Sequence, residues 1–316
     1  MKIHLTILFI VTLFVNFTFA QGVYKTENHL WRSQKDEVYL QEISKKILTD
    51  EPVQSVAEYN GKCYVLQGNK VHIVNNELVP DNSAPSDVLK IESENNSLWI
   101  LTSNGIYLLD GKNWKKIDDK KYVDVCTHNG VVHAATRDEI YRFDGKKFIS
   151  TKPVNGYYGS DVTNLMEDGT QVFADPVELG PVAQIESYSG TLYVLRPGQL
   201  VLFDGKTVNQ DFIDWGVMPS QNTNDIVSFG NRMYIGTDRG LAELRGAALK
   251  TIKGIDGLPV ENTTCLEKGF DNDLWIGTSR GAIRMVDGEF QYFGPGMWLP
   301  NQKVNDIAVG DNVVYV

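Results

Sequence analysis

The sequence predicts an all-β protein built from repeats, and three observations support this fold class. Similar turns recur as "YLLDGKNW" at 107–114, "YRFDGKKF" at 141–148 and "VLFDGKTV" at 201–208. Runs of β-branched and aromatic residues flank each Asp-Gly turn, which is typical of short strands joined in hairpins. No segment has sustained helical periodicity. The repeating unit therefore consists of short antiparallel strands.

The spacing of the turns predicts how the units assemble. Anchors at positions 75, 110, 144, 204, 245 and 287 are separated by 35, 34, 60, 41 and 42 residues. The interval of 60 corresponds to two units, so residues 152–183 are expected to hold a degenerate copy. Four strands every 35 to 42 residues are typical of a β-propeller, whose blades cover one another's apolar faces. We expect about seven four-stranded blades, with eight as the alternative count, and an extended solenoid or paired sandwiches as the alternative fold. Trp99 and Trp275 occupy matched strand positions and should be buried between blades.

The N-terminus has the pattern of a cleavable secretory signal peptide. Lys2 precedes an apolar run from Leu5 to Val15, and Thr18-Phe19-Ala20 offers a small-residue cleavage site. The run is shorter than the ~20 apolar residues that span a bilayer. We expect residues 1–20 to be removed, the mature protein to be periplasmic or secreted, and no membrane span in this chain. An uncleaved anchor is the alternative.

The two ends of the remaining chain resemble parts of a unit. Residues 55–316 hold the repeats, and residues 21–54 form a separate N-terminal segment that contains "DEVYLQEISKKI" (36–47). This stretch is similar to "NGIYLLDGKNWKKI" (104–117), so it could close the ring. The last stretch, "VNDIAVGDNVVYV" (304–316), matches only the first two strands of a unit. The sequence predicts a chain cut in mid-blade, with downstream domains of the same polypeptide as partners, and closure by the N-terminal segment is compatible with this.

Charge and motifs restrict the function. Without Lys2 the mature chain has 29 basic and 40 acidic side chains, a net charge of −11, which disfavours nucleic-acid binding. The three cysteines are expected to be buried and free, and no Cys-His spacing suggests a zinc site. No nucleophile elbow, HExxH motif or phosphate loop is present. We expect no metal and no cofactor, while enzymatic activity stays open because an axial site cannot be read from sequence separation.

The candidate binding site lies in irregular segments. Residues 150–182 break the repeat and combine Tyr157 and Tyr158 with Asp161 and Glu178, a set suited to stacking on sugars and binding their hydroxyls. The alternative is a decayed blade whose tyrosines cover a core edge. Trp215 and Trp298 fall in equivalent links between units, where they could line the same mouth or fill gaps between blades. The predicted ligand is an oligosaccharide or another small molecule.

Three units resemble the two-component regulator propeller repeat of bacterial extracytoplasmic proteins. They are "LWIGTSRGAIRMVDGEFQYF", "MYIGTDRGLAEL" and "LWILTSNGIYLLDGKNW", the last with Leu101 where the repeat usually has glycine. The resemblance implies the periplasmic input domain of a membrane-spanning sensor that binds an oligosaccharide and signals to a kinase region beyond residue 316. The alternative is the N-terminal module of a secreted polysaccharide-processing enzyme, a lyase or hydrolase, whose catalytic domain lies downstream.

Overall fold

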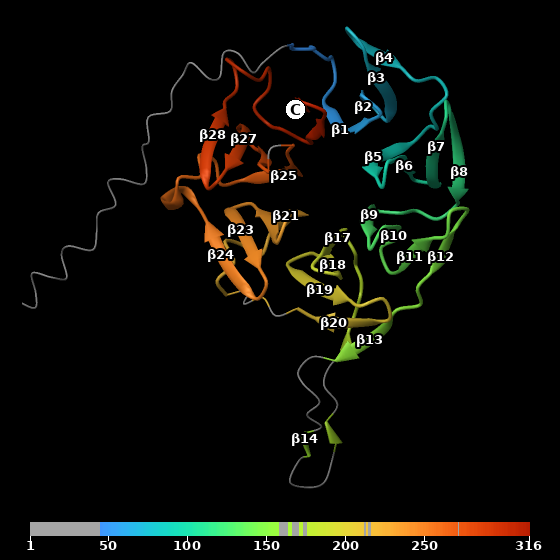
Figure 1. Ribbon diagram of the computed structural model, residues 1–316, viewed down its shortest axis with the longest axis vertical. Helices are drawn as coiled ribbons and strands as arrows, with labels where there is room; N and C mark the ends of the chain where they lie inside the picture. The colour runs from blue at the N-terminus through green and yellow to red at the C-terminus, as the bar shows by residue number, and fades with distance from the viewer. Residues whose placement is uncertain are drawn as a thin grey trace, which may run out of the picture.

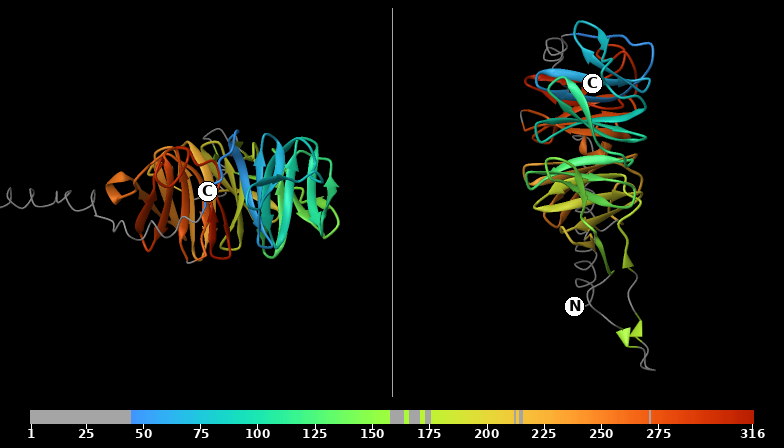
Figure 2. Two further views of the ribbon diagram at one scale, coloured as in Figure 1. Left: turned by 90° about the horizontal axis from the view of Figure 1, so that it is seen from above. Right: turned by 90° about the vertical axis from the view of Figure 1, so that its right-hand side faces the viewer.

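The structure is a computed structural model that describes residues 45–157, 164–165, 171–172, 176–211, 213, 216–270 and 272–316, with the backbone alone at 157, 164–165 and 171–172. This part of the chain forms a ring of antiparallel sheets around a central axis (Figure 1). Seen from the side, the ring is a disc whose strands cross its thickness (Figure 2). The all-β propeller predicted from the repeats is confirmed.

Six sheets each contribute four strands in chain order and are numbered here as blades 1 to 6. The first three blades are β1 (Val53–Tyr59), β2 (Lys62–Gln67), β3 (Lys70–Val74) and β4 (Leu78–Pro80); β5 (Val88–Glu94), β6 (Ser97–Thr102), β7 (Gly105–Asp110) and β8 (Asn113–Asp118); and β9 (Asp124–His128), β10 (Val131–Ala135), β11 (Ile140–Phe143) and β12 (Phe148–Ser150). The last three are β17 (Gln184–Tyr188), β18 (Thr191–Arg196), β19 (Gln199–Phe203) and β20 (Thr207–Gln210); β21 (Thr223–Phe229), β22 (Arg232–Thr237), β23 (Gly240–Arg245) and β24 (Ala248–Ile252); and β25 (Thr263–Lys268), β26 (Leu274–Thr278), β27 (Gly281–Val286) and β28 (Glu289–Phe293). A short 3-10 helix, η4 (Gly254–Asp256), lies in the link between the last two blades.

The described residues form six four-stranded blades and not the expected seven or eight, because the described parts of 152–183 do not form a blade. Instead β13 (Val154–Tyr157) runs parallel to β20 and widens blade 4, and β16 (Pro176–Val177) pairs with β13. The backbone N–H of Val154 donates to the carbonyl of Lys206 at 2.8 Å. Two further short strands, β14 (Asn164–Leu165) and β15 (Gln171–Val172), pair only with each other among the described residues. The segment extends an existing sheet.

The ring nevertheless closes through the end of the chain. A two-stranded sheet, β29 (Ala308–Gly310) and β30 (Val313–Tyr315), follows blade 6. The innermost strands touch in the cyclic order β1, β5, β9, β17, β21, β25 and β29, and β29 returns to β1. Six sectors of the described ring are thus complete blades, and the seventh holds only β29 and β30.

A buried threonine shapes the turn between the second and third strands of the three best-matched units. In blade 5, Thr237 Oγ1 donates to the carbonyl of Gly240 at 2.7 Å and accepts from the N–H of Arg239 at 3.1 Å. The same pair of bonds joins Thr102 to Gly105 and Asn104, and Thr278 to Gly281 and Arg280. Gly240 has φ +131°, and a Cβ there would lie 2.7 Å from the carbonyl oxygen of Ile252. The threonine and glycine of the repeat are therefore required by local hydrogen bonding and by backbone conformation.

The core lies between blades, as the repeat requires. Trp99 and Trp275 are 1% and 8% exposed and pack in separate inter-blade clusters, as predicted. The Asp-Gly turns are exposed. Cys63, Cys126 and Cys265 are buried free thiols, which confirms the prediction for the cysteines.

Candidate functional site

A belt of side chains surrounds the axis and joins neighbouring innermost strands. Asp124 Oδ2 accepts a hydrogen bond from the N–H of Ile185 in the next blade at 2.7 Å. Asp225 Oδ2 does the same for Leu266 at 2.6 Å. Each belt residue directly precedes a buried apolar residue in the innermost segment of its sector. The belt consists of Ser55, Lys90, Asp124, Gln184, Asp225, Cys265 and Asp306, and all of these except Lys90 and Cys265 accept a hydrogen bond from a backbone N–H of the next sector.

Lys90 is the one belt residue whose side chain has no acceptor atom. In its place, Glu92 Oε2 accepts from the N–H of Val125 at 3.0 Å. Lys90 Nζ donates to Asp124 Oδ1 at 2.5 Å and also pairs with Glu92. The Asp124 side chain is only 2% exposed, whereas Lys90 is 37% exposed. Although burial opposes the charge, the two carboxylates raise the pKa of Lys90 well above its usual value. The lysine therefore stays charged and compensates part of the acidic axis.

Several carboxyl groups lie near the axis on the innermost segments, and we call them the axial carboxyl groups. Burial raises the pKa of Glu186 and of Glu267 to about 8 and that of Asp225 to about 7. Burial likewise raises the pKa values of Glu94 and Asp306. These shifts arise because water is partly removed from the carboxyl groups and because they lie near one another. An anionic ligand at the axis would disfavour their ionisation further and would meet a negative charge on each group that is ionised, so the axis disfavours anionic ligands.

One face of the disc carries the links between blades and the turns between second and third strands; we call it the link face. Backbone hydrogen bonds join the two sets, for example from Val182 to the carbonyl of Arg137 at 2.7 Å and from Ser279 to that of Asn262 at 3.0 Å. The segments predicted to share one mouth therefore include two that do lie on this face: the link with Glu178 and the link with Trp298.

The structure places only some of the predicted site residues. Glu178 is exposed, and its carbonyl accepts from Arg196 Nη1 at 2.8 Å. Trp298 is half-buried and packs against the cluster that contains Trp275. These two links are three sectors apart, so they face each other across the ring. Tyr157 contributes its backbone to β13, while Tyr158, Asp161 and Trp215 lie outside the described residues.

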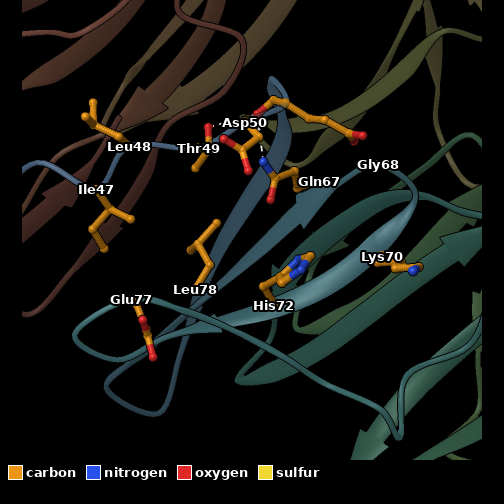
Figure 3. A pocket seen from close by; sticks show the side chains of 11 residues that line it. Ile47, Leu48, Thr49, Asp50, Gln67, Gly68, Lys70, His72, Glu77 and Leu78 are labelled. Carbon is orange, nitrogen blue, oxygen red and sulfur yellow. Dashed lines mark hydrogen bonds between the residues drawn. The ribbon is translucent and has the colours of Figure 1, made fainter.

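A cavity of about 470 Å³ lies at the rim of the ring, where the described chain begins. The side chains of Gln67, His72 and Leu78 from blade 1 point into it, and Leu48 and Asp50 border it from the segment before β1 (Figure 3). Gln67 Nε2 donates to the carbonyl of Glu51 at 2.8 Å. The cavity was not predicted, because it depends on what fills the neighbouring sector.

The axial carboxyl groups were also missed, although the sequence contains a signal for them. When the units are aligned on their innermost strands, acidic residues recur inside apolar runs at Glu92, Glu186 and Glu267. A charged residue in such a strand requires a partner or water. The described residues contain no cluster of three or more His, Cys, Asp or Glu side chains arranged to hold a metal ion, and no helix among them is long and apolar enough to cross a membrane.

Comparison with solved structures places the fold among known propellers. The extracellular domain of a hybrid two-component system from B. thetaiotaomicron matches 83% of this chain with a TM-score of 0.54 and 14% identity, and the match covers 38% of that protein's chain. The same type of domain from a second such system matches 84% of this chain, with a TM-score of 0.55, 12% identity and 37% of its own length covered. The chain thus spans well under half of these domains.

An enzyme shares the fold as well. Virginiamycin B lyase from Staphylococcus aureus matches 84% of this chain with a TM-score of 0.58 and 11% identity, over 91% of the lyase. No family model and no curated protein matches the sequence. The solved structures that share the fold therefore include extracellular domains of two-component systems, the class that the repeats resemble, and at these identities the likeness concerns the fold alone.

Proposed function

We propose that this chain is the exported ligand-binding propeller of a two-component sensor and that its ligand is a neutral oligosaccharide. The likeness to extracellular domains of two-component systems, together with the repeats that resemble the regulator propeller, carries this proposal. The signal-like residues 1–20 support a periplasmic or secreted location. In this proposal, downstream domains of the same polypeptide transmit the signal.

The charge distribution supports a neutral ligand. A sulfated or uronate chain that approaches the axis would meet Glu94, Glu186 and Glu267, whereas sugar hydroxyls can donate hydrogen bonds to such carboxylates. Arg196 lies beside Glu178 on the link face and offsets part of the local negative charge. We assign the stacking platform to Tyr157, Tyr158 and Trp215.

Titration calorimetry of residues 21–316 tests this proposal with neutral, uronate and sulfated oligosaccharides of equal length. We expect heat only with neutral chains. Tyr158→Ala and Trp215→Ala should each weaken binding roughly fivefold, since an aromatic contact contributes about 1 kcal/mol. Phe270→Ala is the matched control, because Phe270 is an exposed aromatic residue in a turn between first and second strands, away from the link face.

Three results would contradict parts of the proposal. Binding of the anionic chains alone would reject the neutral ligand. Unchanged affinity in both aromatic variants, with the parent's melting temperature, would reject the platform. Absence of binding to every chain would reject an oligosaccharide ligand. Trp298→Ala is expected to lower the melting temperature, because this side chain packs against an inter-blade cluster.

The alternative drawn from the sequence is a module of a secreted polysaccharide-processing lyase or hydrolase with its catalytic domain beyond residue 316. Because virginiamycin B lyase has this fold over nearly its whole length, we consider as a second candidate that the propeller of such an enzyme holds the catalytic site itself, at the axis. Incubation of the chain with polysaccharides, followed by chromatography of the products, tests this candidate. A module that only binds, or that relies on a downstream catalytic domain, leaves the chain length of the polymer unchanged. Shortened products that disappear in Glu186→Gln, but not in Glu77→Gln, would favour an enzyme with its site at the axis.

A further inference from the structure

The rim cavity lies over a face of blade 1 that no strand of a preceding blade covers among the described residues. Along β3, Val71 belongs to the cluster between blades 1 and 2, so His72 faces the other way, toward β29 and β30. On that same side, Cys63 and Val65 pack with Ala308. The cavity in Figure 3 therefore lies over the outer half of blade 1, on the side of the incomplete sector.

In complete sectors this outer half is covered by the preceding blade. Between blades 5 and 6, Leu241 of β23 and Ile252 of β24 pack in one cluster with Ile283 and Met285 of β27. The sector before blade 1 has no described third or fourth strand. The outer edge of β30 has no described partner, because β30 pairs with β29 alone. Within the described residues, therefore, one edge of β30 and the adjoining face of blade 1 are both without a covering strand.

The described chain begins at this opening. Lys46 Nζ donates to the carbonyl of Met297 at 2.6 Å, and Lys45 Nζ donates to the carbonyl of Asn76. Met297 lies in the link after blade 6 and Asn76 in the turn between β3 and β4, so these contacts span the incomplete sector. In Figure 1 this first segment and the link after β28 border the sector that contains the C-terminus.

The preceding residues have the sequence of the missing strands. Val38-Tyr39-Leu40 matches Ile106-Tyr107-Leu108 of β7, and Ile47 matches Ile117 of β8. Ile117 precedes the belt residue Asp124 by seven positions, and Ile47 precedes the belt residue Ser55 by eight. The spacing therefore suits a third and fourth strand that lead directly into β1.

We propose that residues 36–47 close the ring by adding two strands to β30 and covering the rim cavity. The alignment fixes the register. In blade 2, Glu92 of the first strand pairs with Trp99 of the second, and Trp99 pairs with Leu108 of the third. In the incomplete sector, Ala308 and Tyr315 occupy the positions of Glu92 and Trp99 and pair in the same way. Leu40 corresponds to Leu108, so in this proposal it pairs with Tyr315. Ile106 and Leu108 of β7 pack toward blade 3, the next blade, and by the same alternation Val38 and Leu40 face blade 1 and fill the space beside His72 and Leu78. This inference does not depend on the ligand.

Disulfide trapping in the chain from Gln21 onward tests the register. Cysteines at directly opposed antiparallel positions are close enough to bridge. We expect Leu40→Cys with Tyr315→Cys to form an intramolecular disulfide under mild oxidation, and Leu40→Cys with Val314→Cys, one residue out of register, to remain reduced. Because Cys63 packs in the same cluster as Tyr315, both pairs are made in a Cys63→Ala background, while Cys126 and Cys265 are buried elsewhere.

Truncation provides a second measurement. A chain that starts at residue 35 should melt like the chain from Gln21, whereas a chain that starts at residue 48 should melt several degrees lower. A disulfide that links two molecules would show that a second copy occupies the edge and would overturn the proposal. Absence of the Leu40–Tyr315 crosslink together with equal melting temperatures would overturn it as well, and would leave the edge to another segment.

Discussion

Asp306 Oδ2 accepts a hydrogen bond of 2.8 Å from the backbone N–H of Val56, which lies 250 positions earlier in the chain. This bond repeats, across the join between the two ends, the bond from Ile185 to Asp124 between consecutive blades. The same type of hydrogen bond, from a backbone N–H to a belt side chain of the preceding sector, therefore joins consecutive blades and the two ends of the chain. The two-stranded sector thus contributes a belt residue in the same way as a complete blade.

Removal of the Asp306 carboxylate should therefore weaken the closure of the ring. In Asp306→Ala the half-buried N–H of Val56 loses its acceptor, which costs about 1–3 kcal/mol. We expect a melting temperature several degrees lower in scanning calorimetry, and a smaller change in Asp306→Asn, whose amide oxygen can still accept. Asp311→Ala, in the exposed turn of the same sheet, is the control. Equal melting of Asp306→Ala and the control would show that the join contributes nothing to stability.

The sequence predicted strands and turns well because their signals are local. Thr237 and Gly240, three residues apart, specify a turn through their own hydrogen bond and φ angle. The role of residues 152–183 was mispredicted because a strand–turn–strand pattern does not say which sheet a strand joins. β13 pairs with β20, and Val154 of β13 lies opposite Thr207 of β20, 53 positions later in the chain. Such nonlocal pairing follows from packing, which periodicity does not encode.

The threonine of the repeat offers a direct test of this local signal. Thr237 is fully buried, and Thr237→Val keeps its shape while leaving the carbonyl of Gly240 and the N–H of Arg239 without that partner. We expect a loss of about 1–3 kcal/mol in denaturant unfolding. Thr237→Ser retains the hydroxyl and should recover most of it. A serine variant as unstable as the valine variant would indicate that the methyl group, and not the hydrogen bonds, matters at this position.

The glycine that precedes this threonine in the repeat is required by close packing, both with the neighbouring strand of its own blade and with the link that follows it. A Cβ at Gly277 would lie 2.3 Å from Cys265 Sγ and 2.9 Å from a Val304 methyl group. Gly277→Ala should therefore destabilise the protein by about 1–3 kcal/mol through overpacking. In Gly277→Ala combined with Cys265→Ala, the loss should be smaller than the sum of the two single effects. Simple additivity in urea unfolding would show that the thiol is not the obstacle.

The candidate site was less predictable than the fold, again for a physical reason. Glu186 and Glu267 are 81 positions apart, and only closure of the ring brings their strands to one axis. The sequence did indicate aromatic residues in the links, but the half-buried Trp298 packs against an inter-blade cluster, since a link must also cover the gap between blades. An aromatic side chain in a link is therefore a weaker sign of a binding site than an acidic residue inside an apolar strand.

Titration of the axial carboxyl groups should make stability depend on pH. Glu267 has a pKa raised by burial from 4.5 to about 8, so between these values the folded state binds more protons than the unfolded chain. The free energy of unfolding then decreases as pH rises, by the linkage relation, and Glu186 and Asp225 act in the same direction. Exposed turn carboxylates such as Asp144, whose pKa is lowered by backbone N–H groups, act oppositely but only at lower pH.

We therefore expect the melting temperature to be highest near pH 5 and to fall continuously toward pH 9. Glu267→Gln carries no charge at any pH, so this variant should melt higher than the parent at pH 9 and show a shallower decline between pH 5 and 9. Glu77→Gln, at an exposed turn, should follow the parent. Melting curves recorded across this range at constant ionic strength check the prediction. If the parent and Glu267→Gln have parallel pH profiles, Glu267 ionises in the folded protein as it does in the unfolded chain, and its carboxyl group is more accessible to water than its burial indicates.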